Sequence, residues 1–556
     1  MPTQDNGSSN EANGQGRRRT ATNRPVDARG QRKLRLFAIV LQLALAVFAG
    51  TFVSAPVTQA TLASRTALQT TADRVVTLTI LQLNDVYQIL PSDLDGTGGL
   101  ARIATLQKQA LSESDNMMFV LAGDTISPSL ESMVFKGQQM IDLWNQLGLN
   151  VAVLGNHEFD FKPDVLRQRI KESHFTWLAA NVIDKTTGSP FGGAQRYLIR
   201  EIEGVKFGIF GLLTQDTMLN SQPGPNIEIL DPIATAQSIV PLMRAQGAQV
   251  IIALTHLSVN DDKQVAKAVS INLILGGHEH ELIQTQSGDT PIYKMGSDAR
   301  NLGRIEIKAS AKTGAVQSID CKVIPVTKNV PEDARTRAII DDYEKQLEAR
   351  LGVKLDEKIG ESGVDLDAQQ TTVRAQESNL GDFIADTFRE AAAADVAIMN
   401  GGGIRSDRLY LAGPITNRHV FSILPFKNKV VLIQVTGAEL RQALERGVSR
   451  VVEDKEDGGF PQVAGLRFVY DGKRPAGSRI VSATVGGKNL DDNKTYKLAT
   501  ISYLADGNEG YDMFRGKPDL TPSGKNKFDV DLVLDKIKKT RISPRTDERI
   551  TRRDGS

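Results

Sequence analysis

The sequence predicts two α/β domains that follow a basic and then apolar N-terminal segment. The chain has 556 residues, of which 40% are hydrophobic and 24% are charged. It is therefore too long for one core and too apolar to be disordered. From about residue 73 onward, short aliphatic runs alternate with segments of helical periodicity, such as residues 100–114. That alternation is typical of layered α/β domains.

The N-terminal segment has the composition of an export signal. Residues 1–35 contain eight Lys or Arg and three acidic residues, and an apolar run of 18 residues follows at positions 36–53. Small residues then lead to Ala60, which predicts a signal peptide that is cleaved near that residue. The run also reaches the lower limit for a spanning helix, so an uncleaved membrane anchor is the alternative. Both interpretations of residues 1–60 place the rest of the chain in the periplasm or outside the cell.

The pattern downstream predicts two domains and a linker. We expect the first domain at residues 74–326 and a second α/β domain at residues 358–550. Residues 331–352 begin with proline, carry apolar residues at helical spacing and end in glycine, which predicts an amphipathic linker helix. Cys321 is the only cysteine, so no disulfide within the chain is expected. The net charge of +1 gives no reason to expect a nucleic-acid polymer as partner, and no feature indicates an oligomeric state.

Five predicted strands of the first domain end at residues that can bind metal. Four of the six histidines lie at these ends, and ligands of open α/β sheets bind outside the carboxyl ends of the strands. Each motif alone is more typical of a helix cap, a turn or a core histidine, but all five together predict a metal site. The residues are Asp85, Asp124, Asn156 with His157, His256, and His278 with His280.

This mixture of carboxylate, imidazole and amide groups suits Mn²⁺, Zn²⁺, Co²⁺ or Fe²⁺. The set is too large for one ion, so we expect two divalent ions with Asp124 as the bridging carboxylate. Such a pair clamps the attacking and leaving oxygens of a phosphoryl transfer, with a water of lowered pKa as nucleophile. His157 is followed by Asp160 three residues later. This predicts an imidazolium, oriented by a carboxylate, that stabilises charge on the phosphate or the leaving oxygen.

The motifs that contain these residues resemble those of the calcineurin-like metallophosphoesterases. They are LND at 83–85, GDTIS at 123–127, GNHEFD at 155–160, THLS at 255–258 and GGHEH at 276–280. In the second segment, RAQESNLGDFIAD, NGGGIR, LPFKNKVV and TGAELRQALE are similar to the C-terminal domain of the bacterial 5′-nucleotidase/UDP-sugar hydrolase family. The resemblance implies a four-layer α/β/β/α metallophosphoesterase domain, a linker helix and a second α/β domain that binds the substrate and can rotate to deliver it to the metals.

The resemblance also assigns the metal ligands, motif by motif. It makes His157 and Asp160 the catalytic pair. The first metal would be held by Asp85, Asp124 and His280, and the second by Asp124, Asn156, His256 and His278.

In the second domain, the resemblance assigns residues that bind the substrate. Arg374 and Arg405 match arginines that hold phosphate oxygens, a task suited to the fork of guanidinium donors. Phe426 and Tyr503 match two aromatic residues that sandwich a nucleobase, although the residues alone would favour core packing for both. Asn428 matches a polar contact to the nucleoside.

Three positions depart from the family pattern. Glu509 replaces a shorter aspartate that contacts the base or ribose in relatives, and Gln370 replaces an arginine found in some relatives, which is expected to weaken the binding of an anionic substrate. Tyr87 stands where relatives usually have a histidine ligand of the first metal. A neutral phenol is a poor donor, and its ionisation at pH 7 costs about 4 kcal/mol. Our hypothesis is that Tyr87 lines the site and forms hydrogen bonds but is not a strong ligand of a divalent ion. Water would then take the ligand position that the histidine has in relatives.

The sequence thus predicts an exported two-metal 5′-nucleotidase that releases phosphate from nucleoside 5′-monophosphates. Nucleotide sugars and 2′,3′-cyclic nucleotides are candidate further substrates. One alternative keeps the architecture but hydrolyses non-nucleotide phosphoesters or sulfur esters. Another alternative, motivated by Tyr87, is a catalytically weak surface protein that binds nucleotides.

Overall fold

The computed structural model describes residues 73–92, 96–451, 457–523 and 527–554. The apolar run at 36–53 and the predicted cleavage site at Ala60 lie outside these residues, so both stay predictions. Within the described part of the chain, no helix is both long enough and apolar enough to cross a bilayer. All described residues belong to one unit of mutual contacts.

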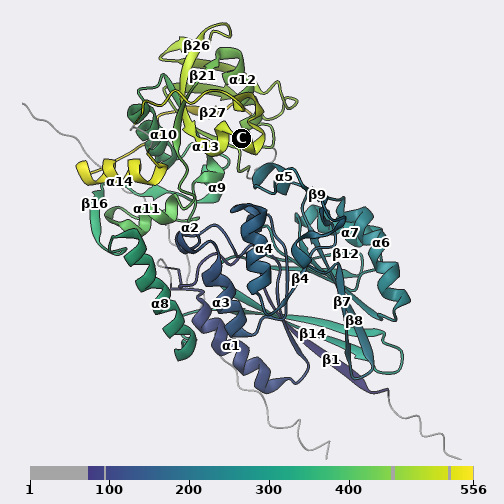
Figure 1. Ribbon diagram of the computed structural model, residues 1–556. Helices are drawn as coiled ribbons and strands as arrows, with labels where there is room; N and C mark the ends of the chain where they lie inside the picture. The colour runs from purple at the N-terminus through teal and green to yellow at the C-terminus, as the bar shows by residue number, and fades with distance from the viewer. Residues whose placement is uncertain (1–72, 93–95, 452–456, 524–526, 555–556) are drawn as a thin grey trace, which may run out of the picture. The chain divides into compact units, whose positions relative to one another are not determined.

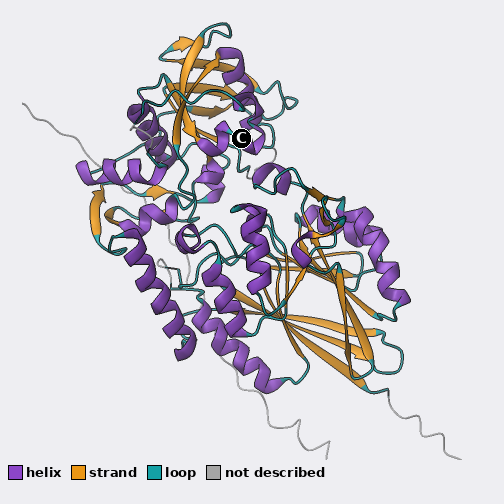
Figure 2. Ribbon diagram, in the orientation of Figure 1, coloured by secondary structure: helices purple, strands orange, loops and turns teal. Residues whose placement is uncertain are grey.

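Two six-stranded sheets form the first domain (Figures 1 and 2). The first sheet has the order β15 (Val316–Pro325), β14 (Asn301–Ser310), β1 (Val75–Leu83), β2 (Met117–Leu121), β3 (Val151–Val153) and β4 (Thr176–Leu178). The second has the order β12 (Leu282–Ser287), β13 (Thr290–Met295), β11 (Leu273–Gly276), β10 (Val250–His256), β8 (Val205–Leu213) and β7 (Tyr197–Ile202). Strands β1 to β4 are parallel to one another, as are β8, β10, β11 and β13. Parallel strands bring their carboxyl ends to one edge of each sheet.

The central strands are apolar on both faces because both faces are covered. In β8, Phe207 and Ile209 pack in the core between the sheets, where Leu78 of β1 also lies. Phe210 and Leu212 alternate with them and pack against the outer helices. The sheets therefore face each other across one core, and each has a second core on its other side.

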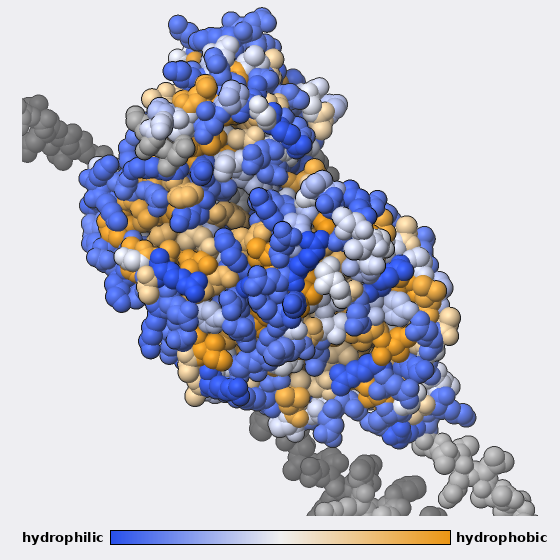
Figure 3. All heavy atoms as spheres, viewed as in Figure 1, coloured by the Kyte–Doolittle hydropathy of each residue, from blue (hydrophilic) through white to orange (hydrophobic). Residues whose placement is uncertain are grey.

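Helices cover the two outer faces and complete four layers (Figure 3 shows the mixed polar and apolar surface that results). Those that share the core of the first sheet are α1 (Leu100–Glu113), α2 (Leu130–Phe135), α3 (Gln138–Leu147) and α4 (Lys162–Glu172). Those on the second sheet are α6 (Pro232–Ala245) and α7 (Val259–Ala268). Shorter elements are β5 (Val182–Asp184), β6 (Ser189–Pro190), β9 (Ile227–Ile229) and α5 (Thr217–Asn220). The predicted α/β/β/α fold class of this domain is confirmed.

Helix α8 (Ala334–Leu351) connects the two domains. The Asp333 side chain caps its first turn by accepting from the Thr336 N–H, and Gly352 ends it in the left-handed conformation, with φ +70°. On the helix, Glu344 lies 2.8 Å from Arg418 of α11 (Asn417–Ile423) in the second domain. Both ends thus carry the caps that the sequence around residues 331–352 contains.

A second α/β domain follows α8. Its main sheet has the order β21 (Val430–Thr436), β26 (Thr495–Ile501), β18 (Val396–Asn400) and β22 (Pro461–Ala464). A second sheet has the order β25 (Lys488–Asn489), β24 (Ile480–Val485), β23 (Leu466–Tyr470) and β27 (Ile550–Arg552). Two strand pairs are β16 (Lys358–Ser362) with β20 (Gly413–Thr416) and β17 (Leu366–Asp367) with β19 (Leu409–Tyr410). The helices are α9 (Gln370–Val373), α10 (Asn379–Ala392), α12 (Gly437–Gly447), α13 (Ser502–Ala505) and α14 (Asp529–Lys539), besides α11.

The side chain of Glu131, in the first turn of α2, makes the stability of the protein depend on pH. It is buried, and burial together with the charge of Glu344 raises its pKa to about 7 from 4.5. Because the folded pKa is the higher one, the stability that neutral Glu131 contributes is complete below pH 4.5 and is lost as pH rises through about 7. We predict that Glu131→Gln raises the free energy of unfolding by about 1–3 kcal/mol at pH 8 and leaves it unchanged at pH 4.5, as measured by thermal unfolding.

The matched control is Glu228→Gln, which removes the charge of an exposed glutamate in β9. At pH 8, Glu228→Gln should shift the unfolding midpoint by less than Glu131→Gln does. Equal midpoints for Glu131→Gln and wild type at pH 8 would contradict the prediction.

Candidate metal centre and substrate cavity

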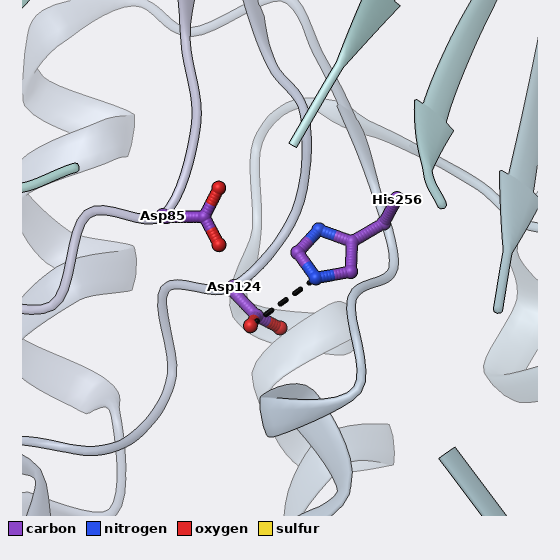
Figure 4. A group of neighbouring side chains, drawn as sticks. All are labelled: Asp85, Asp124 and His256. Carbon is purple, nitrogen blue, oxygen red and sulfur yellow. Dashed lines mark ion pairs between the residues drawn. The ribbon is translucent and has the colours of Figure 1, made fainter. Parts of the chain in front are cut away.

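Three side chains meet where β1, β2 and β10 end. Asp85 follows β1, Asp124 follows β2 and His256 is the last residue of β10. One ligand atom of each lies within 4.8 Å of the others (Figure 4), and Nε2 of His256 is 3.2 Å from Oδ2 of Asp124. All three residues are buried. The structure thus brings together candidate ligands from both sheets.

The backbone at the candidate ligands is strained. The angle φ is +53° at Asp85, +57° at Asp124 and +85° at His278, in the region that favours glycine. A residue with a side chain in such a conformation costs about 1–3 kcal/mol and persists only where its surroundings fix it. The loops after β1, β2 and β11 therefore hold these side chains in fixed turns.

Glu158 was not among the predicted site residues, yet it anchors two of the loops. Its buried carboxylate accepts hydrogen bonds from the backbone N–H groups of Asp124 (3.0 Å), Thr125 (2.7 Å), Ile126 (3.3 Å) and Gly155 (2.5 Å). Burial and the charge of Asp124 raise its pKa to about 7. The carboxylate ties the loop after β2 to the loop after β3. The only sequence signal for this role is the glutamate within the GNHEFD motif.

Two glycines allow the loops to approach the carboxylates closely. A Cβ atom at Gly155 would lie 2.1 Å from Oδ1 of Asp124, and one at Gly277 would lie 2.2 Å from the carbonyl oxygen of Ala122. No larger residue fits at either position without moving the backbone. The glycines of the GNHEFD and GGHEH motifs are therefore structural requirements of this centre.

The buried acids and imidazoles shift one another's pKa values. Burial would raise the pKa of Asp124, but His256 and His157 hold it well below its usual range. Burial raises the pKa of Asp85 to about 7, although His256 opposes the shift. Burial would lower the pKa of His256, but the charge of Asp124 raises it to about 10. Two carboxylates this close in a buried site need a positive charge beside them.

The buried polar atoms of this group fit a metal. The amide oxygen of Asn156 is buried and has no hydrogen-bond partner among the described residues, and the buried Nε2 of His256 has the carboxylate of Asp124 as its neighbour. Nδ1 of His256 lies 2.9 Å from the carbonyl oxygen of Ala122, which leaves Nε2 directed at the carboxylates. Carboxylate oxygen, amide oxygen and imidazole nitrogen together form a ligand set for a divalent transition metal.

His278 and His280 follow β11 and border the same group. The N–H of His278 donates to Oδ2 of Asp85 at 3.0 Å, and Nε2 of His280 lies 3.6 Å from Oδ1 of Asp85. Burial and the charge of His256 lower the pKa of His278 to about 4. Burial and the charge of Arg405 hold the pKa of His280 well below its usual range. Both imidazoles are therefore neutral, which is the form that binds metals.

The hydroxyl of Tyr87 reaches directly into the group. It lies 3.2 Å from Oδ1 of Asp85, 3.1 Å from Oδ2 of Asp124 and 2.9 Å from Nε2 of His280. Burial, together with the charges of the two carboxylates, holds the pKa of this phenol well above its usual value. Tyr87 thus contacts all three residues that were predicted to hold the first metal.

His157 and Asp160 form a hydrogen-bonded pair beside the centre. Nδ1 of His157 lies 2.7 Å from Oδ2 of Asp160, and Oδ1 of Asp160 accepts a hydrogen bond from Ser221 at 2.8 Å. The backbone N–H of His157 donates to Oδ1 of Asp124 at 2.9 Å. Although burial would lower the pKa of His157, the charges of Asp160 and Asp124 raise it. The pair therefore favours a protonated, oriented imidazole.

A cavity of about 230 Å³ joins these residues to the second domain. It is lined by Asp124, Asn156, His157, Asp160, His278 and His280 from the first domain and by Arg374, Arg405, Phe426, Asn428, Tyr503 and Glu509 from the second. All predicted substrate-binding residues therefore line the same space as the candidate metal centre. Further lining residues that were not predicted include Asn400, Asp216, Arg450 and Asp457.

Arg405 is held against two aromatic rings at the wall of this cavity. Its guanidinium carbon lies 5.7 Å from the ring centroid of Tyr87 and 5.9 Å from that of Phe426, which is within the range of cation–π attraction. Arg405 is buried. Its positive charge is therefore fixed beside the metal centre.

Arg446 forms ion pairs with both Glu509 and Asp457. Nη2 of Arg446 lies 3.7 Å from Oε2 of Glu509, and Nη1 of Arg446 lies 2.8 Å from Oδ2 of Asp457. Burial and the charge of Asp457 raise the pKa of Glu509 to about 7. Glu509 lies 52 positions from Asp457 and 63 from Arg446 in the sequence, so this arrangement could not be inferred from sequence.

The second domain also contacts the first at the metal centre. Nε2 of Gln370 lies 2.7 Å from Nδ1 of His280, and Arg450 forms an ion pair with Asp216 at 3.2 Å. Gln370 was predicted only as a loss of positive charge. In the structure, Gln370 contacts the imidazole of His280, which is a candidate ligand of the first metal.

Both domains match known protein families. Residues 78–282 match the calcineurin-like phosphoesterase family, and residues 358–516 match the 5′-nucleotidase C-terminal domain. The snake venom 5′-nucleotidase of Gloydius brevicauda is 30% identical over 526 residues, which cover 85% of this chain and 88% of that protein. The trifunctional nucleotide phosphoesterase YfkN of Bacillus subtilis is also 30% identical, but this chain spans only 35% of its length.

Solved structures give the same result. The 5′-nucleotidase precursor of Thermus thermophilus superposes with a TM-score of 0.79 at 29% identity, and the match covers 86% of this chain and 100% of that one. The sulfate thiohydrolase SoxB of Thermus thermophilus, with a TM-score of 0.72 at 18% identity over 86% of this chain and 97% of that one, shares the fold. The chain belongs to the 5′-nucleotidase family, whose members are metal-dependent phosphoester hydrolases with a calcineurin-like phosphoesterase domain and a 5′-nucleotidase C-terminal domain.

Proposed function

We propose that the protein is an exported two-metal phosphohydrolase that releases phosphate from nucleoside 5′-monophosphates. One observation carries the proposal: a single cavity is lined by four of the six candidate metal ligands, by Arg374 and Arg405, and by Phe426 and Tyr503. A nucleotide needs these three kinds of contact: metal ions at the scissile phosphate, arginines for the phosphate charge and aromatic rings for the base. The size of the cavity suits a small molecule rather than a polymer.

Two divalent ions would be held by the residues at the strand ends. Asp85, Asp124 and His280 would hold the first, and Asp124, Asn156, His256 and His278 the second. When bound, such ions supply a nucleophilic water of lowered pKa and stabilise charge on the attacking and leaving oxygens. The donor set suits Mn²⁺, Zn²⁺, Co²⁺ or Fe²⁺. Asp124 would be the ligand shared by both ions, which is supported by the position of its Oδ2, 3.1 Å from the Tyr87 hydroxyl and 3.2 Å from Nε2 of His256.

His157 would stabilise the charge that develops on the phosphate or the leaving oxygen. Asp160 engages Nδ1 of the ring, so Nε2 is left as the donor toward the cavity. Ser221 fixes the other oxygen of Asp160, which limits rotation of the pair. A protonated imidazole in this position provides electrostatic stabilisation and a proton for the leaving group.

The second domain would bind the rest of the nucleotide. Arg374 and Arg405 would hold phosphate oxygens, and Phe426 and Tyr503 would stack on the base, a contact worth about 1–3 kcal/mol. Asn428 and Glu509 would contact the nucleoside through hydrogen bonds. With a pKa near 7, Glu509 can accept or donate a hydrogen bond at neutral pH. Nucleotide sugars and 2′,3′-cyclic nucleotides are further substrates that this cavity is proposed to accept.

We place the mature enzyme in the periplasm or outside the cell, because residues 1–60 have the composition of an export signal. Cleavage near Ala60 would free the enzyme, whereas an uncleaved run at 36–53 would anchor it to the membrane.

We predict that the purified protein releases phosphate from AMP, that a chelator abolishes the release and that added Mn²⁺ restores it, because the water nucleophile depends on the ions. The same assay with UDP-glucose, 2′,3′-cyclic AMP and glycerol phosphate tests the substrate range. Faster release from glycerol phosphate than from AMP would favour the non-nucleotide hydrolase. Nucleotide binding without phosphate release in the presence of metal would favour a binding protein.

His157→Ala should lower kcat for AMP by about 10²–10⁴-fold, the usual contribution of a positioned acid or base. Its metal content, measured by mass spectrometry, should equal that of wild type. Asp160→Asn should lower kcat in the same direction because the ring loses its orienting carboxylate. His174→Ala, which alters an exposed histidine, serves as the matched control. Wild-type kcat in His157→Ala would exclude this role.

Phe426→Ala and Tyr503→Ala should each raise KM for AMP by about 10- to 100-fold, since base stacking on an aromatic ring is worth about 1–3 kcal/mol. KM for glycerol phosphate, which has no base, should change little. Tyr197→Ala removes a half-buried aromatic residue of β7 outside the cavity and controls for general effects. Equal changes in KM for both substrates would count against a base-binding role.

A further inference from the structure

Among the described residues, Lys294 is the only buried lysine, and none of its side chain is exposed to solvent. It lies near the end of β13. Its ammonium donates to the carbonyl oxygen of Leu257 at 2.6 Å, to the carbonyl oxygen of Gly277 at 2.8 Å and to Oε2 of Glu279. These hydrogen bonds use all three N–H groups of the ammonium, as a buried charge requires.

Two carboxylates balance the charge of Lys294. Oδ2 of Asp262, in α7, lies 3.0 Å from Nζ, and Glu279 provides the second carboxylate. Although burial would lower the pKa of Lys294, the charges of Asp262 and Glu279 raise it. The hydroxyl of Thr255 donates to the other oxygen of Asp262 at 2.7 Å, and the N–H of Val259 donates to that of Glu279 at 2.6 Å. The cluster thus joins β10, α7 and the loop after β11 to β13.

The two carbonyl groups belong to neighbours of candidate ligands of the second metal. Leu257 directly follows His256, and Gly277 directly precedes His278. His256 ends β10, whereas His278 follows β11, so one ammonium connects the two segments that carry these imidazoles. Its role for these segments parallels that of Glu158 for the loops after β2 and β3.

The peptide group between Gly277 and His278 is bound on both sides. Its oxygen accepts from the ammonium, and its N–H donates to Oδ2 of Asp85 at 3.0 Å. His278 has a φ of +85°, a conformation that persists only where the surroundings fix it. A Cβ atom at Gly276 would lie 2.9 Å from Cε of Lys294. The lysine therefore packs directly against the main chain that leads to His278.

We propose that Lys294 is a positioning residue for the second metal ion. It acts through the main chain beside His256 and His278, and so holds the two imidazoles at the spacing that one ion requires. This inference rests on the two-metal centre of the proposed function and extends it to a residue that does not line the cavity. The first ion would draw two of its three ligands from the loops after β1 and β2, so it should depend less on Lys294.

Metal-binding measurements on the full chain test this role. The protein is stripped with a chelator and titrated with Co²⁺. Calorimetry gives the affinities, and visible absorption reports the ligands around each ion. His256→Ala and His280→Ala identify the binding steps of the second and the first ion. Lys294→Met has a side chain of similar length without a donor. It should weaken the step lost in His256→Ala by about 10- to 100-fold, the usual effect of losing an outer partner, and the other step by less than about threefold.

A double variant tests the same role if Lys294→Met fails to fold. Lys294→Met combined with Asp262→Asn keeps the net charge of the cluster, because one cation and one of its two carboxylates are removed together. It should show the same selective loss. Arg169→Met is the matched control, since it removes another buried cation, which pairs with Glu172 in α4 and does not line the cavity. It should lower the unfolding temperature and keep both affinities.

The possible results separate this role from the proposed function. Wild-type affinity for both ions in Lys294→Met, or an equal loss at both steps, would overturn the positioning role and leave the metal centre in place. The same selective loss in Arg169→Met would also overturn it, because it would follow from lower stability alone. A wild-type chain that binds fewer than two ions would instead overturn the proposed two-metal centre.

Discussion

The buried negative charge of Asp124 is the constraint on which the rest of the site depends. A carboxylate with only 2% of its residue surface exposed must be matched by positive charge or by hydrogen-bond donors. Its neighbours meet that need from several directions: the ring of His256, the N–H of His157 and the hydroxyl of Tyr87. These partners come from both sheets, so the two sheets must end together for the charge to be tolerated.

The strand ends could be predicted from the sequence because they rest on a local rule. An apolar run followed at once by an acid or a histidine, as at Asp85 and His256, identifies a strand and the edge on which it ends. The family resemblance then predicted substrate-binding roles for residues such as Arg405 and Phe426, which line one cavity. Composition and periodicity alone would have assigned Phe426 to a hydrophobic core.

Other parts of the site depend on contacts that no local pattern records. Glu158 resembles a surface acid next to a histidine until its four backbone partners are known. Gln370 meets His280 across 90 positions of chain and from another domain. Arg446 reaches Glu509 across 63 positions within the second domain. Long-range pairs of this kind follow from how the elements pack, which the sequence alone does not specify.

Glu158 also affects how the site responds to amino-acid substitutions. Its carboxylate accepts hydrogen bonds from four backbone amides, so contacts within the protein hold the loops after β2 and β3. Such contacts reduce the conformational freedom of the loops, and with it the ordering entropy that opposes ligand binding. A substitution at a single position beside the candidate ligands, as at residue 87, therefore occurs next to loops that these hydrogen bonds already hold in place.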